Sequence, residues 1–164
     1  MTIGARMFGY LLGATLLAAP MPAAAAACGT GLNPILVLAT GVSFGLYSPG
    51  AAAATPSNGT VTVTCTVVLA STLPSFTIAL SAGTNGTFNQ RKMAFGAARL
   101  NYNLYTTASL GTIWGDGTTP TATQAYAAST GLSLTTFTAY GSLAARQFAT
   151  PGLYTDGITV TVTY

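Results

Sequence analysis

Histidine and glutamate are both missing from this 164-residue chain, and Asp116 and Asp156 are its only acidic side chains. General acid–base catalysis needs a group that titrates near the working pH, and a hydroxyl nucleophile usually needs an adjacent base. Each Asp also lies beside glycine, in Gly115-Asp-Gly117 and Asp156-Gly157, and Asp-Gly is a common turn dipeptide. We therefore predict turns at both positions and no catalytic residue, and we expect neither an enzyme nor a cofactor.

Basic residues are almost as scarce as acidic ones. The chain has five Lys and Arg residues and a net charge of +3, and charged residues make up only 4% of it. Cations that are so few and so scattered cannot neutralise a phosphate backbone, which excludes nucleic acid as a partner. The pair Arg91-Lys92 is interpreted as part of a solvated turn.

The first 27 residues are typical of a secretory signal peptide, with Arg6 ahead of the apolar stretch Met7–Pro20 and small residues at Ala23–Ala27. We predict an exported chain with one mature domain over residues 28–164. The alanine run allows several cleavage positions. Cys28 after three alanines also leaves a lipoprotein open, although the usual leucine-like residue before such a cysteine is missing. No run in the mature part reaches the roughly 18 apolar residues of a transmembrane helix.

Cysteine is limited to Cys28 and Cys65, and both lie in the predicted mature part. An even number of cysteines in an exported chain predicts one disulfide. The bond would close a loop of about 37 residues, which contributes about 3 to 4 kcal/mol on the loop-entropy model. Two distant thiols without histidine do not make a zinc site, so no metal is expected.

Amphipathic helices are missing as well, and short alternating segments take their place. Gly, Pro and Asn separate these segments, a pattern that predicts an all-β sandwich or barrel. In one of them Val61, Val63, Cys65 and Val67 share a face, which points the cysteine toward the core. A buried strand interrupted at Gly41 is expected before it. The predicted strands are Ile35–Leu38 with Val42–Tyr47, Thr60–Val67, Phe76–Leu80, Leu100–Tyr105, Thr135–Tyr140 and Ile158–Tyr164.

The last seven residues alternate apolar and hydroxyl side chains up to the end of the sequence. A strand period of two places Ile158, Val160, Val162 and Tyr164 on one face and the threonines on the other. The pattern does not say which strand pairs alongside. Because an unpaired edge invites a strand from another chain, we predict that this edge binds a partner.

Eight segments spread over nearly the whole mature chain form a set. They are Val42–Pro49, Gly59–Cys65, Ile78–Gly83, Arg91–Met93, Leu100–Tyr105, Trp114–Gly117, Gly152–Asp156 and Val160–Tyr164. In this order and spacing they resemble the spore coat protein U domain found in subunits of archaic chaperone-usher pili. The resemblance implies an incomplete immunoglobulin-like β-sandwich that lacks its final strand. It also implies a structural pilus subunit, exported through the periplasm to the cell surface or beyond it.

The resemblance further implies three kinds of partner. A periplasmic chaperone would lend a strand to the edge Ile158–Tyr164 and hold the terminal carboxylate. An outer-membrane usher would then exchange that strand for the N-terminal extension of a neighbouring pilus subunit. Burial of alternate apolar side chains and main-chain hydrogen bonds would drive this donor-strand complementation.

Two departures from the family pattern bear on these expectations. The interval from Cys28 to Phe44 is longer than usual, which leaves the register of the first strand open. Signal cleavage would leave almost nothing before Cys28 to serve as a donor strand. We therefore expect a minor or tip subunit, unless residues 32–38 are donated instead.

Two other functions remain open. The same fold could serve as a secreted adhesin-type binding module that uses exposed loops such as Ile113-Trp114 and Tyr126. Packing of the Trp114 ring into the sandwich is nevertheless the favoured interpretation. A small outer-membrane β-barrel would need strands of about 9 to 11 residues, and segments such as Leu100–Tyr105 are too short for it.

Overall fold

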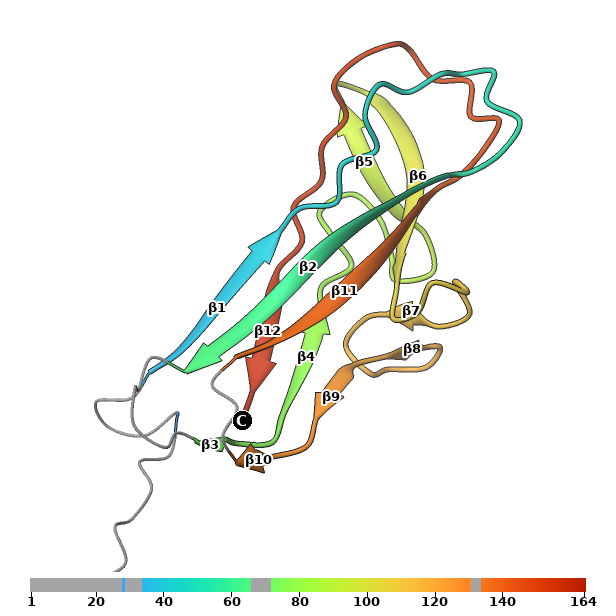
Figure 1. Ribbon diagram of the computed structural model, residues 1–164. Helices are drawn as coiled ribbons and strands as arrows, with labels where there is room; N and C mark the ends of the chain where they lie inside the picture. Colours follow the sequence, from blue (N-terminus) through green and yellow to red (C-terminus); the bar gives the residue numbers. More distant parts are fainter. Residues whose placement is uncertain (1–27, 29–33, 66–71, 131–133) are drawn as a thin grey trace, which may run out of the picture.

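Strands are the only regular elements in the part of the chain that the computed structural model describes, which is residues 28, 34–65, 72–130 and 134–164 (Figure 1). They are β1 (Ile35–Thr40), β2 (Thr55–Cys65), β3 (Thr72–Leu73), β4 (Phe76–Leu80), β5 (Arg91–Phe95), β6 (Ala98–Tyr105), β7 (Ile113–Trp114), β8 (Thr121–Ala122), β9 (Gln124–Tyr126), β10 (Ser129–Thr130), β11 (Leu134–Leu143) and β12 (Val160–Thr163). The all-β prediction is confirmed. The predicted signal peptide lies outside the described residues.

The larger sheet has the strand order β1-β2-β11-β6-β7-β8, and β5 pairs with β6. Its centre is the long antiparallel pair of β2 and β11, in register from Leu134 opposite Thr64 to Leu143 opposite Thr55. β11 is longer than the predicted strand Thr135–Tyr140. The reason is that β2 begins at Thr55 rather than at the predicted Thr60, so that β11 has a partner along its whole length up to Leu143; its last four residues also pair with β6.

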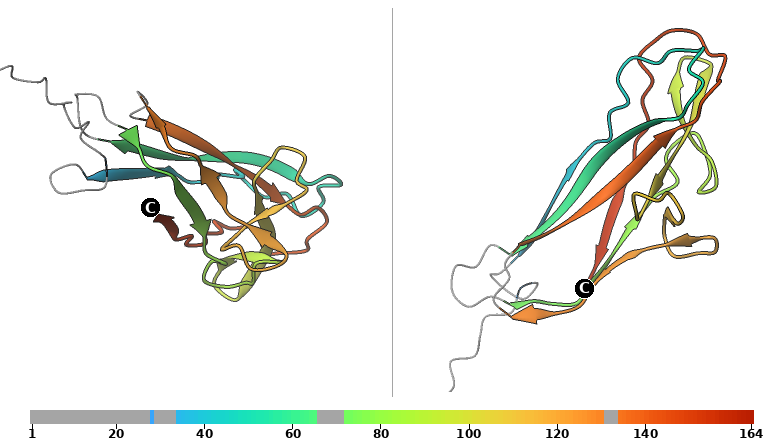
Figure 2. Two further views of the ribbon diagram at one scale, coloured as in Figure 1. Left: turned by 90° about the horizontal axis from the view of Figure 1, so that it is seen from below. Right: turned by 45° about the vertical axis from the view of Figure 1, so that its right-hand side comes forward.

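The smaller sheet, with the order β12-β4-β9, packs against the larger one as the second layer of an immunoglobulin-like sandwich that lacks a strand (Figure 2). β4 buries Phe76, Ile78 and Leu80, as its alternation predicts. From the larger sheet Val61 and Val63 of β2 enter the same core. Val67, which was expected on their face, lies outside the described residues. Other buried members of the core include Leu73, Leu100, Leu104, Trp114, Ala139 and Leu143.

β1 differs from the predicted buried strand. It runs only from Ile35 to Thr40 at the edge of the larger sheet, with Leu36 and Leu38 exposed by 56% and 64%. Its only partner in the described chain is β2, where Ile35 lies opposite Cys65. After Gly41 the backbone leaves the sheet, so residues 42–47 form no strand. We call residues 41–47 the strap.

Candidate functional site

A groove of ≈ 560 Å³ lies between β1 with the strap on one side and the C-terminal segment on the other. Its lining is mostly apolar and comes from both sheets: Val61, Leu80, Leu100, Leu104, Ala139 and Leu143. β1 and β12 are the edge strands of their sheets. Among the described residues no strand pairs with β1 on the side away from β2, or with β12 on the side away from β4. The groove is therefore flanked by two strands with free backbone edges.

Part of the inner face of β1 is left accessible to solvent in the described part of the chain. Ala39 and Val37 alternate with the outward-facing Leu36 and Leu38, so they point to the same side as the buried valines of β2. Yet Val37 is 37% exposed, and Ala39 is exposed and lines the groove. Apolar side chains that face inward but remain accessible indicate a place for further apolar side chains.

The strap is seated on two glycines of the central strand pair. A Cβ at Gly59 would lie 2.9 Å from Val42 Cγ2, and one at Gly141 would lie 2.6 Å from Val42 Cγ1 and 3.0 Å from Phe44 Cζ. The ring of Phe44 also meets Tyr102 edge-on, with 5.9 Å between ring centroids. Only residues without a side chain allow the strap to lie this close to β2 and β11.

The far end of the strap is fixed by Tyr47. Its hydroxyl donates to the carbonyl oxygen of Gln147 at 2.5 Å and accepts from the backbone N–H of the same residue at 2.8 Å. The Gln147 side chain in turn bonds both backbone groups of Asn101 on β6. The first wall of the groove is thus tied to the larger sheet at both ends.

The second wall is the C-terminal segment, residues 155–163, which passes along the sandwich and ends in β12 (Figure 1). At its start Thr155 exchanges two backbone hydrogen bonds with Ala94 of β5, at 2.8 and 3.1 Å. At its end β12 pairs with β4, with Val160 opposite Leu80 and Val162 opposite Ile78. The wall therefore begins on the larger sheet and ends on the smaller one.

The predicted edge residues lie on this wall, with two corrections. Ile158, Val160 and Val162 pack against the core, and the first two line the groove. The strand itself begins at Val160 rather than at Ile158. Tyr164, predicted on the same face, is 63% exposed, because the ladder with β4 ends at Thr163 and the ring extends past it.

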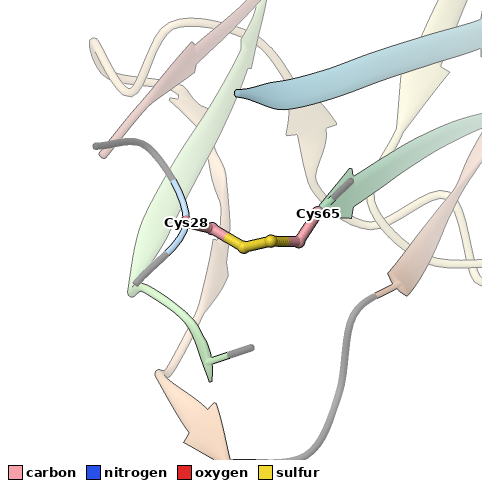
Figure 3. Close-up of a disulfide and its surroundings, with 2 residues drawn as sticks. All are labelled: Cys28 and Cys65. Carbon is pink, nitrogen blue, oxygen red and sulfur yellow. A yellow bond between two sulfur atoms is a disulfide. The ribbon is translucent and has the colours of Figure 1, made fainter. Parts of the chain in front are cut away.

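The predicted disulfide is present: Cys28 is bonded to Cys65 at the end of β2 (Figure 3). Both cysteines are buried, and Cys65 points inward with the valines of β2 as the alternation indicated. Because Cys65 lies opposite Ile35, the bond fixes the chain close to the point where β1 begins. The disulfide therefore secures the base of the first wall.

Arg91 contradicts the interpretation of Arg91-Lys92 as a solvated turn. Arg91 lies on β5 and is fully buried. Its guanidinium donates to Asn103 Oδ1 at 2.7 Å, to the Ser81 carbonyl at 2.7 and 3.0 Å and to the Trp114 carbonyl at 2.8 Å. Burial lowers the pKa of Arg91, while Tyr102 and Asp156 act in the opposite direction. Since its hydrogen bonds are made inside the fold, we assign Arg91 a structural role.

Of the two aromatic residues considered as surface contacts, Trp114 is buried and Tyr126 is half-buried against the core. Trp114 has no exposed surface, and its indole N–H donates to the Ile78 carbonyl at 2.9 Å. Tyr126 stacks on Phe76 with 5.0 Å between ring centroids. The favoured interpretation of Trp114 as a packing residue is therefore confirmed, and its ring is not available as a surface contact.

The described residues hold no group of three or more metal-ligating side chains. Among them there is also no helix with the length and apolarity needed to cross a membrane.

Comparison with protein families identifies the chain. The sequence model of the Spore Coat Protein U domain matches residues 13–161, most of the chain. The protein belongs to the spore coat protein U domain family. The match begins within the segment predicted as a signal peptide. A search of curated proteins finds no match to this family member.

A solved structure supports the fold of this spore coat U domain. The chain is similar to one in the crystal structure of the CsuC–CsuE chaperone–tip adhesion subunit pre-assembly complex from archaic chaperone-usher Csu pili of Acinetobacter baumannii. The TM-score is 0.53 at 22% sequence identity, and the match covers 82% of this chain and 40% of that chain. The spore coat U domain thus spans well under half the length of that neighbour.

Sequence reasoning missed the strap and the polar contacts of the second wall. Val42, Phe44 and Tyr47 were recognised as apolar positions but assigned to a buried strand. Gly59 and Gly141, on which they pack, lie far along the sequence, so only the paired strands β2 and β11 reveal the seat. Asp156 was assigned to a turn because of the glycine that follows it.

Proposed function

We propose that this protein is a structural subunit of a surface pilus assembled by the chaperone-usher route, and that its groove accepts a β-strand from a second protein. The groove itself carries the proposal. It is lined by apolar side chains of both sheets and lies between β1 and β12, two edge strands of the described chain. An incoming strand with alternate apolar residues would bury them in the groove while its backbone bonds a free edge.

The proposed occupants follow one another during assembly. A periplasmic chaperone would fill the groove first, an outer-membrane usher would receive the complex, and a neighbouring pilus subunit would then supply the replacement strand. Family membership and a fold shared with a chain of a chaperone–subunit complex support this order. The route places the mature protein at the cell surface.

The finer proposal is a minor or tip position in the fibre. It depends on the predicted cleavage of the signal peptide close to Cys28, which would leave little chain to donate. N-terminal sequencing of the exported protein tests it directly. A mature start well before Cys28, with an alternating apolar extension, would favour a repeating shaft subunit.

The first test of strand acceptance is co-expression in a periplasm with a chaperone of the chaperone-usher class, followed by size exclusion. We expect a soluble one-to-one complex, whereas most of the lone subunit should aggregate or be degraded and only a small soluble fraction should remain for measurements on the isolated chain. The double variant V160D/V162D should abolish the complex, because it places two charges on the apolar face of β12. The matched control T161D/T163D places the same charges on the exposed face of that strand and should retain it.

A second variant separates strand acceptance from folding. Ala39 is exposed and lines the groove, so A39W can place its ring in the groove without removing a core contact. We expect a chain with the circular dichroism of the wild type but no complex. A stable, soluble wild-type monomer that does not bind the chaperone would contradict the proposal and favour a self-contained secreted binding domain.

A further inference from the structure

The second wall changes sheets at Asp156-Gly157. Before this point Thr155 is hydrogen-bonded to Ala94 of β5, in the larger sheet. After it the backbone N–H of Ser81 donates to the Thr159 carbonyl at 3.0 Å, and the ladder of β12 with β4 follows. The direction of the chain at Asp156-Gly157 therefore decides where β12 lies relative to the groove.

The carboxylate of Asp156 accepts three hydrogen bonds, two of them from residues that are distant in the sequence. Its Oδ1 accepts the backbone N–H of Thr84 at 2.8 Å and that of Gly157 at 2.9 Å, and its Oδ2 accepts the hydroxyl of Tyr102 at 2.8 Å. Thr84 follows the end of β4, and Tyr102 belongs to β6. One side chain thus connects the crossing point with both sheets.

The space for this carboxylate is provided by Gly83. That residue has a φ of +82°, and a Cβ there would lie 3.0 Å or less from the carboxylate oxygens of Asp156. Glycine meets both demands, since it adopts positive φ without a penalty and has no side chain to collide. The turn after β4 is therefore shaped to receive Asp156.

The environment keeps the Tyr102 hydroxyl protonated in its contact with Asp156. Burial and the hydrogen bond to Asp156 raise the pKa of Tyr102 above its usual range, so its hydroxyl remains a donor. Asp156 and Tyr102 both line the groove, which is otherwise mostly apolar. The polar pair sits where the second wall turns.

We propose that Asp156 is the positioning residue that holds β12 as the second wall of the groove and so allows the groove to accept a strand. The inference rests on the proposed function, since it names a residue on which strand acceptance depends. β12 pairs with β4 over only four residues. Without the carboxylate, the N–H groups of Thr84 and Gly157 and the hydroxyl of Tyr102 lose their acceptor, and the segment can swing away from the groove.

The test compares D156A and D156N with the matched control D116A. Asp116 also lies beside glycine, but its carboxylate accepts hydrogen bonds from Thr118 and Thr121, which are close to it in the sequence. D156N keeps the size of the side chain and the Oδ1 acceptor while it replaces Oδ2. Two quantities are measured on the full mature chain: amide hydrogen exchange, and the fraction recovered in a one-to-one complex with the co-expressed chaperone.

We expect D156A to speed amide exchange in residues 157–163 by about tenfold or more, with β2 and β11 unchanged. Recovery of the complex should fall several-fold, D156N should lie between D156A and the wild type, and D116A should match the wild type. Exchange that is unchanged, or that is equally faster in β2 and β11, would overturn the inference.

Failure of the inference is distinguishable from failure of the proposed function. Selective loosening of residues 157–163 with normal recovery of the complex would refute a role of Asp156 in strand acceptance, while the proposed function would stand. A wild-type chain that forms no complex would refute the proposed function and strand acceptance with it. The exchange measurement would then still decide whether Asp156 holds β12.

Discussion

The first wall of the groove is held by a six-residue ladder, by packing on glycine and by the hydrogen bonds of Tyr47 at its far end, whereas the second wall has a ladder of only four residues and depends on the hydrogen bonds of its crossing point. β1 pairs with β2 along its whole length, the disulfide lies at its base, and the strap rests on Gly59 and Gly141. The second wall depends on the carboxylate of Asp156 and on Ser81, whose hydroxyl accepts the N–H of Thr159 at 2.9 Å.

This difference teaches which kinds of substitution each wall tolerates. A wall that rests on glycine fails when volume is added, because neighbouring backbone cannot move aside cheaply. A wall held by hydrogen bonds fails when an acceptor is removed, because the donors left behind lose a partner. The second wall, which has the shorter ladder, contains β12. Under the proposed function β12 is the strand predicted to contact the chaperone.

The largest effect is expected from the double variant C28S/C65S, which removes the covalent support of the first wall. The cysteines are 37 residues apart, so loss of the bond should lower the free energy of unfolding by about 4 kcal/mol on the loop-entropy model. Urea unfolding can be followed by the fluorescence of Trp114, the single tryptophan, which is fully buried. A change below about 1 kcal/mol would mean that the ladder of β1 alone secures this wall.

A smaller loss is expected when volume is added under the strap. In G141V the new Cβ would lie 2.6 Å from Val42 Cγ1 and 3.0 Å from the Ser57 carbonyl oxygen, so the strap must move. We expect the free energy of unfolding to fall by about 1 to 3 kcal/mol, measured by the same urea titration. G50V is the matched control, since nothing lies within 4 Å of a Cβ at Gly50. Equal stability of the two variants would show that the strap does not depend on its glycine seat.

The smallest effect compares two hydroxyls, one that is hydrogen-bonded to each wall. S81A removes the acceptor of the Thr159 N–H and should cost about 1 kcal/mol, with faster amide exchange confined to residues 157–163. S57A removes the donor to the Ser43 carbonyl at 2.6 Å, an exposed contact of the strap, and should change stability by less than about 0.5 kcal/mol. If S57A proved the more damaging change, the contrast between the walls would be wrong.

The sequence predicted most of the strands because each carries its own alternation. Phe76, Ile78 and Leu80 face the core as expected, and so do Val61 and Val63. Strand ends were less accurate. β11 extends to Leu143 because β2 begins at Thr55 and pairs with it there, and β12 starts later than its pattern because the chain is still crossing between sheets at Asp156. Ladder length depends on the neighbouring strand, which alternation does not reveal.

The candidate site was predicted only in part. The apolar face of the last strand was predicted from the alternation of neighbouring residues. The disulfide was predicted because the chain has only two cysteines. The buried state of Arg91 was missed, because a pair of basic residues is usually solvated. Its partners are the carbonyls of Ser81 and Trp114, which approach Arg91 only when β4, β5 and β7 assemble.

By itself the sequence determined the all-β class, the pairing of its two cysteines, the lack of histidine and glutamate, and the apolar face of Val160 and Val162. These properties are local or compositional, so the period of two and the residue counts are enough to predict them. Only the tertiary structure decided that Asp116 and Asp156, which both lie beside glycine, differ. Asp116 bonds residues up to five positions away, whereas Asp156 reaches Tyr102 and Thr84, which are 54 and 72 positions away. Folding alone brings such groups together, because hydrogen bonds depend on distance in space.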